Sequence, residues 1–375
     1  MNYQNPVSRR RRWPLVLIVL LVVLGGLWAG AWHYGAGIAE RTLDGWKARE
    51  AKAGRTYACA SQSIGGFPFG IEVRCSDASA ELRSNQPPLA LKTRDMVVSA
   101  QVWQPTILTT EFTGPLTVAD PGQPPFVTVT WQYAQTQLHG LPVSPESASI
   151  RLDRPVVDRT GGEGNAFKAD RVDLNGRLVS GTVQANPVIE VILKLLAASA
   201  PSWHQAAAIP FDADITAVLK GLKDFAPKPL PQRLRELQAA GGRIEIVKAR
   251  MQQRETIAVA SGALGLSPAG RLDGQLRLIV ANLDKFLPAL GLDQMLAQER
   301  ASPKLNNAFG ALDRIMPGLG NVARQNAAPA LIASINLMGQ PAELEGQRAV
   351  ALPLRFDDGQ VSLGPLKIGM TPSLF

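Results

Sequence analysis

The sequence predicts a mainly β protein with accessory helices (α+β), built as a large curved antiparallel sheet or a sandwich behind one N-terminal transmembrane helix. Two observations predict the sheet: segments of alternating apolar and polar residues recur from Thr56 onward, and clusters of Pro and Gly separate them. That pattern is typical of short antiparallel strands. The third observation is an unbroken apolar run from Leu15 to Trp32, which is long enough to cross a bilayer.

The charges around the apolar run predict its orientation. Four arginines (Arg9, Arg10, Arg11 and Arg12) precede it, and no Asp, Glu, Lys or Arg follows until Glu40. Because positive charge is retained on the cytoplasmic side, we expect residues 1–12 to be a cytoplasmic tail and residues 13–34 to be the transmembrane helix. Everything after Tyr34 then lies across the membrane. The alternative is a signal peptide cleaved after Ala31, which also exports the remainder.

The remaining elements follow in order along the chain. A helical connector is expected over residues 35–55, ended by Gly54. Strands are expected in the segments 57–63, 69–76, 96–103, 126–133 and 147–153, and residues 167–178 are expected to form a strand, a turn and a second strand. Two later hairpins are expected at 258–280, with the turn at 267–270, and at 352–363, with the turn at Asp358-Gly359. Helices are expected at 188–198, 231–240, 283–297 and 303–315.

The chain has two cysteines, Cys59 and Cys75, and both lie in the exported part. In a hairpin that turns at residues 65–68 and is centred on Phe67, the two positions face each other. Cysteines outside the cytoplasm usually pair, so we predict a structural disulfide between them. The alternative is a redox or metal pair, but the sequence has no Cys-x-x-Cys motif and no histidine nearby.

The sequence carries few signals for chemistry. The exported part has only two histidines beyond the membrane, His139 and His204, and they lack metal-binding spacing. We therefore expect no catalytic residues, no metal and no cofactor, and we expect that the protein is not an enzyme. The net charge is +8, but four of the positive charges are the arginine cluster and the others are scattered. A nucleic-acid partner is therefore not expected.

Apolar strand residues are the remaining candidates for function. Leu276, Leu278 and Val280 should share one face of a strand, and so should Val361 and Leu363. These two faces line either a closed core or an apolar groove. A further candidate is the turn, where Phe67 and Phe69 would form an apolar tip that touches lipid; its alternative role is purely structural.

The block formed by Cys59, Gly66-Phe67-Pro68-Phe69 and Cys75, together with the closing stretch 352–369, resembles the domain-of-unknown-function family 2125 of bacterial envelope proteins. The resemblance covers essentially the whole chain. It implies a protein of the bacterial inner membrane with a periplasmic β-rich domain. From the order of the expected elements we place this domain at residues 56–375, with two halves that meet near 200–205. The hairpin texture is also similar to AsmA-like proteins, which implies a long curved sheet and a role in envelope lipid traffic.

These observations together predict a non-enzymatic, membrane-anchored periplasmic protein that binds or guides lipid or supports envelope assembly. Membrane lipid is the expected partner. One alternative is an interaction scaffold, in which sheet edges or the helix at 283–297 bind other proteins. The other alternative is an enzyme with a cryptic site.

Overall fold

The N-terminal part of the chain forms one long helix, α1 (Trp13–Lys52). It has 40 residues, and in the computed structural model it is the one helix among the described residues that is long and apolar enough to cross a membrane. The described residues are 13–161, 164–203, 205–226, 228–282, 339–364 and 366–375, so the four arginines of residues 9–12 lie outside them. At 1.5 Å per residue the helix is about 60 Å long, twice what a bilayer core requires.

The expected transmembrane helix and helical connector are thus continuous. No proline interrupts residues 15–52, so nothing breaks the helix between its apolar half and its polar half. It ends before Gly54, whose φ of +77° is the left-handed conformation that commonly follows a helix. The polar half rests on the first strands: Trp46 stacks on Tyr57 with ring centroids 4.7 Å apart, and Arg55 donates to Glu50.

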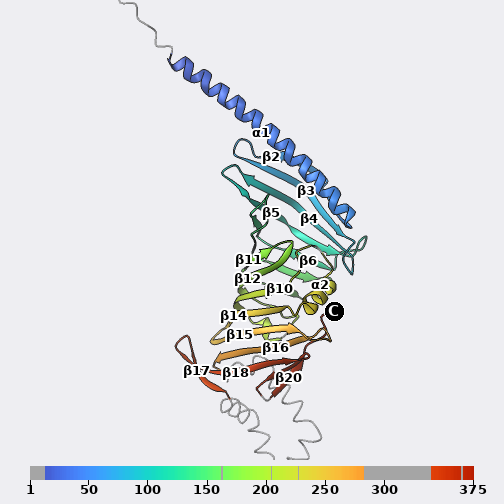
Figure 1. Cartoon of the computed structure of the whole chain (residues 1–375), viewed down its shortest axis with the longest axis vertical. Coiled ribbons are helices and arrows are strands. Elements are labelled where there is room, and N and C mark those ends of the chain that lie inside the picture. Colours follow the sequence, from blue (N-terminus) through green and yellow to red (C-terminus); the bar gives the residue numbers. More distant parts are fainter. Residues whose placement is uncertain (1–12, 162–163, 204, 227, 283–338, 365) are drawn as a thin grey trace, which may run out of the picture.

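The rest of the described chain is a long antiparallel sheet, in which most strands pair with the next strand along the chain (Figure 1). The strands nearest to α1 are β1 to β5: Arg55–Ala58, Ser61–Gly65, Gly70–Leu82, Leu89–Gln101 and Gln104–Ala119. The middle strands are β6 to β12: Val127–Thr130, Tyr133–His139, Ser147–Asp153, Val156–Arg159, Asn165–Lys168, Arg171–Thr182 and Ala185–Ala198. The remaining strands are β13 to β20: Phe211–Lys220, Arg243–Gln253, Thr256–Leu266, Leu272–Ala281, Gln340–Leu344, Gln347–Asp357, Gln360–Leu363 and Leu366–Met370.

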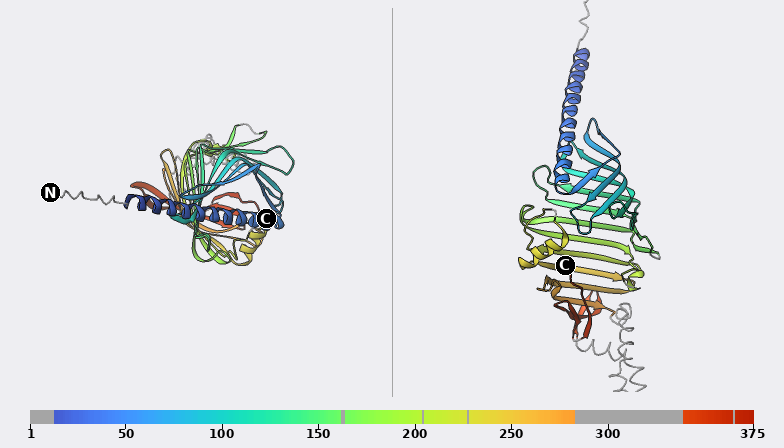
Figure 2. Two further views of the ribbon diagram at one scale, coloured as in Figure 1. Left: turned by 90° about the horizontal axis from the view of Figure 1, so that it is seen from above. Right: turned by 90° about the vertical axis from the view of Figure 1, so that its right-hand side faces the viewer.

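The sheet has one main ladder and one branch. From β3 the ladder runs through β4, β5, β7, β8 and β11, and from there through β12 to β16, β18 and β19. The branch leaves β5 through β6, β9 and β10. Strands β12 and β13 pair from Ile189 to Ala198, so the sheet continues across residues 200–205. Seen from above in Figure 2, the sheet is strongly curved, and it does not close on itself.

One expected helix is wrong: residues 188–198 belong to strand β12, not to a helix. The segment pairs with β11 on one side and with β13 on the other. Its Val and Ile residues favour strands, and two neighbouring strands satisfy its backbone, so the tertiary setting overrides the helix-start signal of Asn186-Pro187. Here Asn186 has a φ of +47° and lies in the hairpin that precedes the paired stretch.

Other expectations are confirmed. The helix at 231–240 is α2 (Leu230–Ala239), which begins beside Pro229 and is followed by Gly241 in the left-handed region. Strands β15 and β16 form the hairpin that turns at 267–270, and β18 and β19 form the hairpin that turns at Asp358-Gly359. The helices expected at 283–297 and 303–315 lie outside the described residues. The C-terminus returns to α2, where the guanidinium of Arg235 lies 5.5 Å from the ring of Phe375.

Candidate functional site: an apolar trough

An apolar row crosses one face of the sheet from β7 to β19. Residues that pair directly across neighbouring antiparallel strands lie on the same face. Following the register from strand to strand gives a row without any charged or polar side chain. Its members are Leu138, Ala148, Gly176, Val191, Ala217, Ile246, Gly262, Leu276, Leu354 and Leu363. We call this face the trough.

Parallel rows widen the trough on both sides. One contains Ile150, Leu174, Leu193 and Ile215 in the middle of the sheet. The other contains Leu178, Ile189, Leu219, Ile244 and Leu264, and it continues to Phe356 and Val361. The trough is thus three side chains wide over most of its length.

The middle of the trough holds a cavity of about 1010 Å³. Its floor is formed by β7, β8 and β11 to β13, through side chains that include Ile150, Leu174 and Val191. Its wall is formed by Val183 and by residues 224–226. The latter three residues belong to the segment 222–226, which we call the strap. These side chains are not packed like a core: Ile150 is 39% exposed, and Leu174 and Val191 are half-buried. A volume of this size is at the upper end of the range for small-molecule sites.

Backbone hydrogen bonds and ion pairs fix the strap. The amide of Phe225 donates to the carbonyl oxygen of Val183 at 2.7 Å, and the amide of Asn186 donates to that of Lys223 at 2.9 Å. The ammonium of Lys228 donates to Asp224 at 2.8 Å and to Glu236 of α2 at 2.9 Å. The hydrogen bond from Lys228 lowers the pKa of the Asp224 carboxyl below its usual range. The same contact raises the pKa of the Lys228 ammonium.

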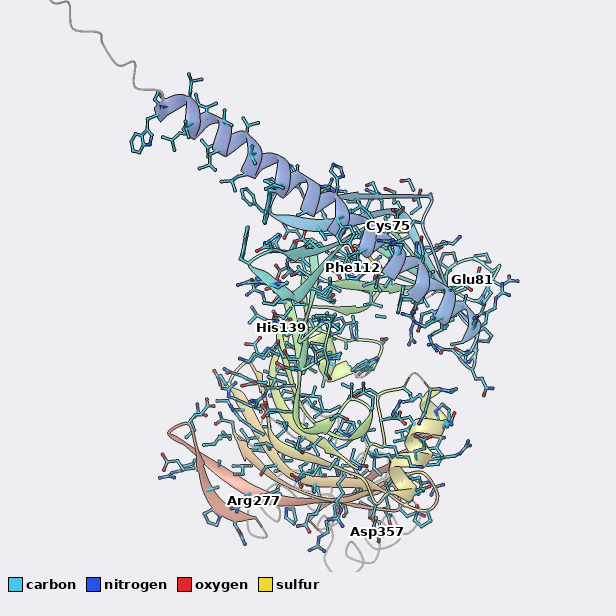
Figure 3. All side chains as sticks on the ribbon, turned by 45° about the horizontal axis from the view of Figure 1, so that its top comes forward. Cys75, Glu81, Phe112, His139, Arg277 and Asp357 are labelled. Carbon is cyan, nitrogen blue, oxygen red and sulfur yellow. A yellow bond between two sulfur atoms is a disulfide. The ribbon has the colours of Figure 1, made fainter. Side chains whose placement is uncertain are left out.

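Helix α2 lies on the trough side of the sheet (Figure 3). Its Leu237 is 5% exposed and packs with Ile189 and Leu222 in a small core. The partly buried Val191, Leu219 and Leu266 surround that core. The helix therefore covers one margin of the trough and extends the wall that the strap begins.

The opposite face of the middle strands carries charged residues, whereas at the far end it holds a small apolar core of Ile257, Ala281 and Ala349. Arg177 pairs with Glu190 at 2.9 Å across β11 and β12, and Lys220 pairs with Glu245 at 2.7 Å across β13 and β14. These residues alternate with the trough residues along the same strands, because successive side chains point to opposite faces. In these middle strands the apolar residues are therefore confined to the trough face, while the charged residues lie on the other face.

The structure places all five residues of the predicted groove on the trough side. Leu276, Leu278 and Val280 are on β16, and the register through β18 brings Val361 and Leu363 to the same face. Their packing differs from that of the cavity. Val280 is 1% exposed and Leu363 is 3% exposed, so this far end of the trough is a buried core.

The predicted tip lies at the other end of the sheet. Phe67 is 54% exposed and Phe69 is 62% exposed, in the loop between β2 and β3. Trp103, in the neighbouring loop between β4 and β5, is 62% exposed, and its ring centroid lies 6.0 Å from that of Phe69.

Cys59 and Cys75 form a disulfide, with Cα atoms 5.4 Å apart. The register behind that prediction was wrong, because Cys75 pairs with Gln62 rather than with Cys59. Cys59 lies in the interruption between β1 and β2, opposite Asp77, which has a φ of +48°. The interruption of the ladder brings the cysteines together without direct pairing.

The cavity residues in β7, β8 and β11 to β13 were not foreseen. Alternation was visible in β8, but the run from Val188 to Ala198 is almost wholly apolar, which hides its period of two. A helix was therefore expected at the very strand that forms the cavity floor. Among the described residues, no group of three or more His, Cys, Asp or Glu side chains is arranged to hold a metal ion.

Comparison with known proteins places the chain in a family. The family model for an uncharacterised protein conserved in bacteria (DUF2125) matches residues 32–372, so the chain belongs to this family. Neither the curated proteins nor the solved structures give a significant match. The likeness to AsmA-like proteins is not supported by these comparisons.

Proposed function

We propose that this protein is a single-pass inner-membrane protein of the bacterial envelope whose trough binds or guides the acyl chains of lipids. The proposal places the N-terminus in the cytoplasm and the sheet in the periplasm, and it assigns no enzymatic step. The observation that carries it is the cavity of about 1010 Å³ on a continuous apolar face. Exposure of a large apolar face to water raises the free energy of the folded protein. Such a face usually marks a site that binds a ligand, a membrane or another protein.

The surroundings of the cavity fit a lipid better than a compact polar ligand. Its floor offers hydrocarbon and glycine, while the charged residues Asp224 and Glu146 line its margin. Acyl chains can lie along the apolar rows while a headgroup stays near the charged margin. Because α1 and the sheet belong to one chain, a membrane-spanning α1 keeps the trough beside a membrane, where lipid is the most abundant apolar molecule.

Gly176 offers a direct test, because it lies in the central row and lines the cavity. Its φ is not in the left-handed region, and a Cβ there would meet only the oxygen of Ala148 at 3.9 Å. Gly176→Phe should therefore fold and fill the cavity with a ring. The matched control is Asn175→Phe, which adds the same ring to the exposed outer face of the same strand.

The measurement uses the full chain in vesicles of phosphatidylethanolamine and phosphatidylglycerol that contain a photoreactive acyl chain. After irradiation, crosslinked peptides are mapped. We expect crosslinks on β8, β11 and β12 in the wild type and in Asn175→Phe, and their loss in Gly176→Phe. Crosslinks confined to α1 in all three proteins would instead favour a scaffold that binds proteins.

Topology needs a separate measurement. A reporter that is active only in the cytoplasm, fused after Phe375, should give no signal, because the four arginines of residues 9–12 precede the span. A strong signal would place the sheet in the cytoplasm and remove the periplasmic part of the proposal. Mass analysis of the mature N-terminus separates a retained helix from cleavage after Ala31.

A further inference from the structure

Four large apolar side chains are exposed together at the end of the sheet nearest to α1. Phe67 and Phe69 lie in the loop between β2 and β3, and Val102 and Trp103 lie in the loop between β4 and β5. The two loops touch, since the amide of Val102 donates to the carbonyl oxygen of Phe69 at 3.0 Å. The exposed fractions of the four side chains are 54%, 62%, 46% and 62% in chain order. We call these four residues the tip.

Helix α1 fixes the level of the tip relative to the apolar span. The indole nitrogen of Trp28 donates to the carbonyl oxygen of Pro68 at 2.9 Å, and that of Trp32 donates to Gly70 at 2.6 Å. The ring of Phe67 also meets the ring of Trp32 edge to face, with centroids 5.6 Å apart. The tip is thus attached to the last two turns of the apolar run, while the helix extends beyond it toward Trp13 (Figure 1).

The length of the span places these two turns at a membrane surface. From Trp13 to Trp32 the helix rises about 29 Å, close to the hydrocarbon core of roughly 30 Å. If Trp13 marks one boundary, Trp28 and Trp32 mark the other. Tryptophan prefers this level, and exposed Phe, Val and Trp side chains lower their free energy by entering it.

The trough continues to the tip. Directly behind the loops, Ile71 pairs with Ala100, Ala100 pairs with Leu108, and Leu108 pairs with Leu138, the first member of the central row. An apolar row without a charged side chain therefore leads from the loops to the cavity, and α1 packs against its first member, Ile71, at Gly35.

We propose that the tip inserts into the nearer leaflet of the membrane that α1 crosses, and that lipid enters the trough there. The partner is the phospholipid leaflet itself. This inference rests on the proposed function for its second half, the entry of lipid, whereas insertion of the tip depends only on α1 spanning the membrane.

The insertion test compares two exposed tryptophans. Trp103 belongs to the tip, and Trp203, which is 77% exposed, follows the end of β12 that lies at the opposite edge of the sheet. Each is replaced by cysteine in the full chain (Trp103→Cys, Trp203→Cys), labelled with an environment-sensitive dye, and reconstituted into phosphatidylethanolamine and phosphatidylglycerol vesicles. A nitroxide on the acyl chains should remove most of the fluorescence at position 103 and leave position 203 unchanged. Equal quenching at both positions, or none at either, would overturn insertion.

The entry test uses the photoreactive vesicles described above. Phe69→Ser with Trp103→Ser should abolish most crosslinking to the cavity strands, while Trp203→Ser should retain it. Full crosslinking in the tip variant would overturn the entrance. Gly176→Phe separates the two proposals. Its ring should exclude lipid from the cavity, so crosslinking to the trough should be lost, while the quenching of the dye at position 103 should stay unchanged. Quenching at 103 with no crosslinking to the trough in any protein would keep the inserted tip and reject lipid binding in the trough.

Discussion

Ile150, in the middle of the trough, is 39% exposed, whereas Val280, at its far end, is 1% exposed. Both residues are β-branched, and both lie on the trough face of the sheet, Ile150 on β8 and Val280 on β16. The middle is bordered by the strap and by α2 at one margin, while the far end is packed, with Leu352 and Leu363 each 3% exposed. The same pattern of residues can thus give a half-exposed cavity in one region and a buried core in another.

The largest expected effect separates these two regions. Val280→Asp places a carboxylate in a core without a partner and should destabilise the protein by several kcal/mol, on the order of 3 kcal/mol or more. Ile150→Asp, at the exposed position, should cost less than about 1 kcal/mol and should weaken crosslinking of lipid. Urea unfolding of both variants checks this. Similar losses of stability would mean that the middle of the trough is packed in solution as tightly as the far end.

A second prediction compares the strands nearest to α1 with the middle of the sheet. Cys59→Ala with Cys75→Ala removes the constraint on a loop of about 15 residues and should cost about 2–4 kcal/mol. In a long sheet each strand contacts mainly its neighbours, so the loss should be local. Hydrogen exchange should accelerate in β1 to β3 and stay unchanged in β12 to β16. Equal acceleration in both regions would show that the sheet opens as one unit.

The smallest expected effect concerns the strap. Lys228 lowers the pKa of Asp224 in the folded protein. The contact therefore stabilises the folded state fully at pH values above the ordinary carboxyl pKa of 3.8. The contribution is lost as the pH falls through the lower pKa of the folded state. Asp224→Asn should therefore be less stable than the wild type at pH 7, and the difference should disappear in acid.

Thermal unfolding as a function of pH tests this prediction, with Asp173→Asn on the outer face of β11 as the control. A difference between Asp224→Asn and the wild type that persists unchanged at pH 2 would show that the strap does not depend on this ion pair. The far end has a comparable pair, Arg250 and Glu345 at 2.6 Å, so both regions are expected to weaken in strong acid.

The sequence alone determined the elements whose signals are local. The apolar run of residues 15–32 forms a helix, Pro and Gly mark the turns of the hairpins β15–β16 and β18–β19, and residues 230–239 form α2. The alternation in β16 placed Leu276, Leu278 and Val280 on one face, because a strand has a period of two whatever its neighbours are.

Only the tertiary structure decided which apolar faces are open. Strand β12 was expected to be a helix, since its apolar run has no visible period and its partners are brought to it by the fold. The disulfide pair was foreseeable, but the interruption of the ladder that joins it was not. The cavity depends on register across five strands and on the strap, whose backbone is held by the hairpin between β11 and β12. These are relations between residues far apart in the chain, and no local pattern records them.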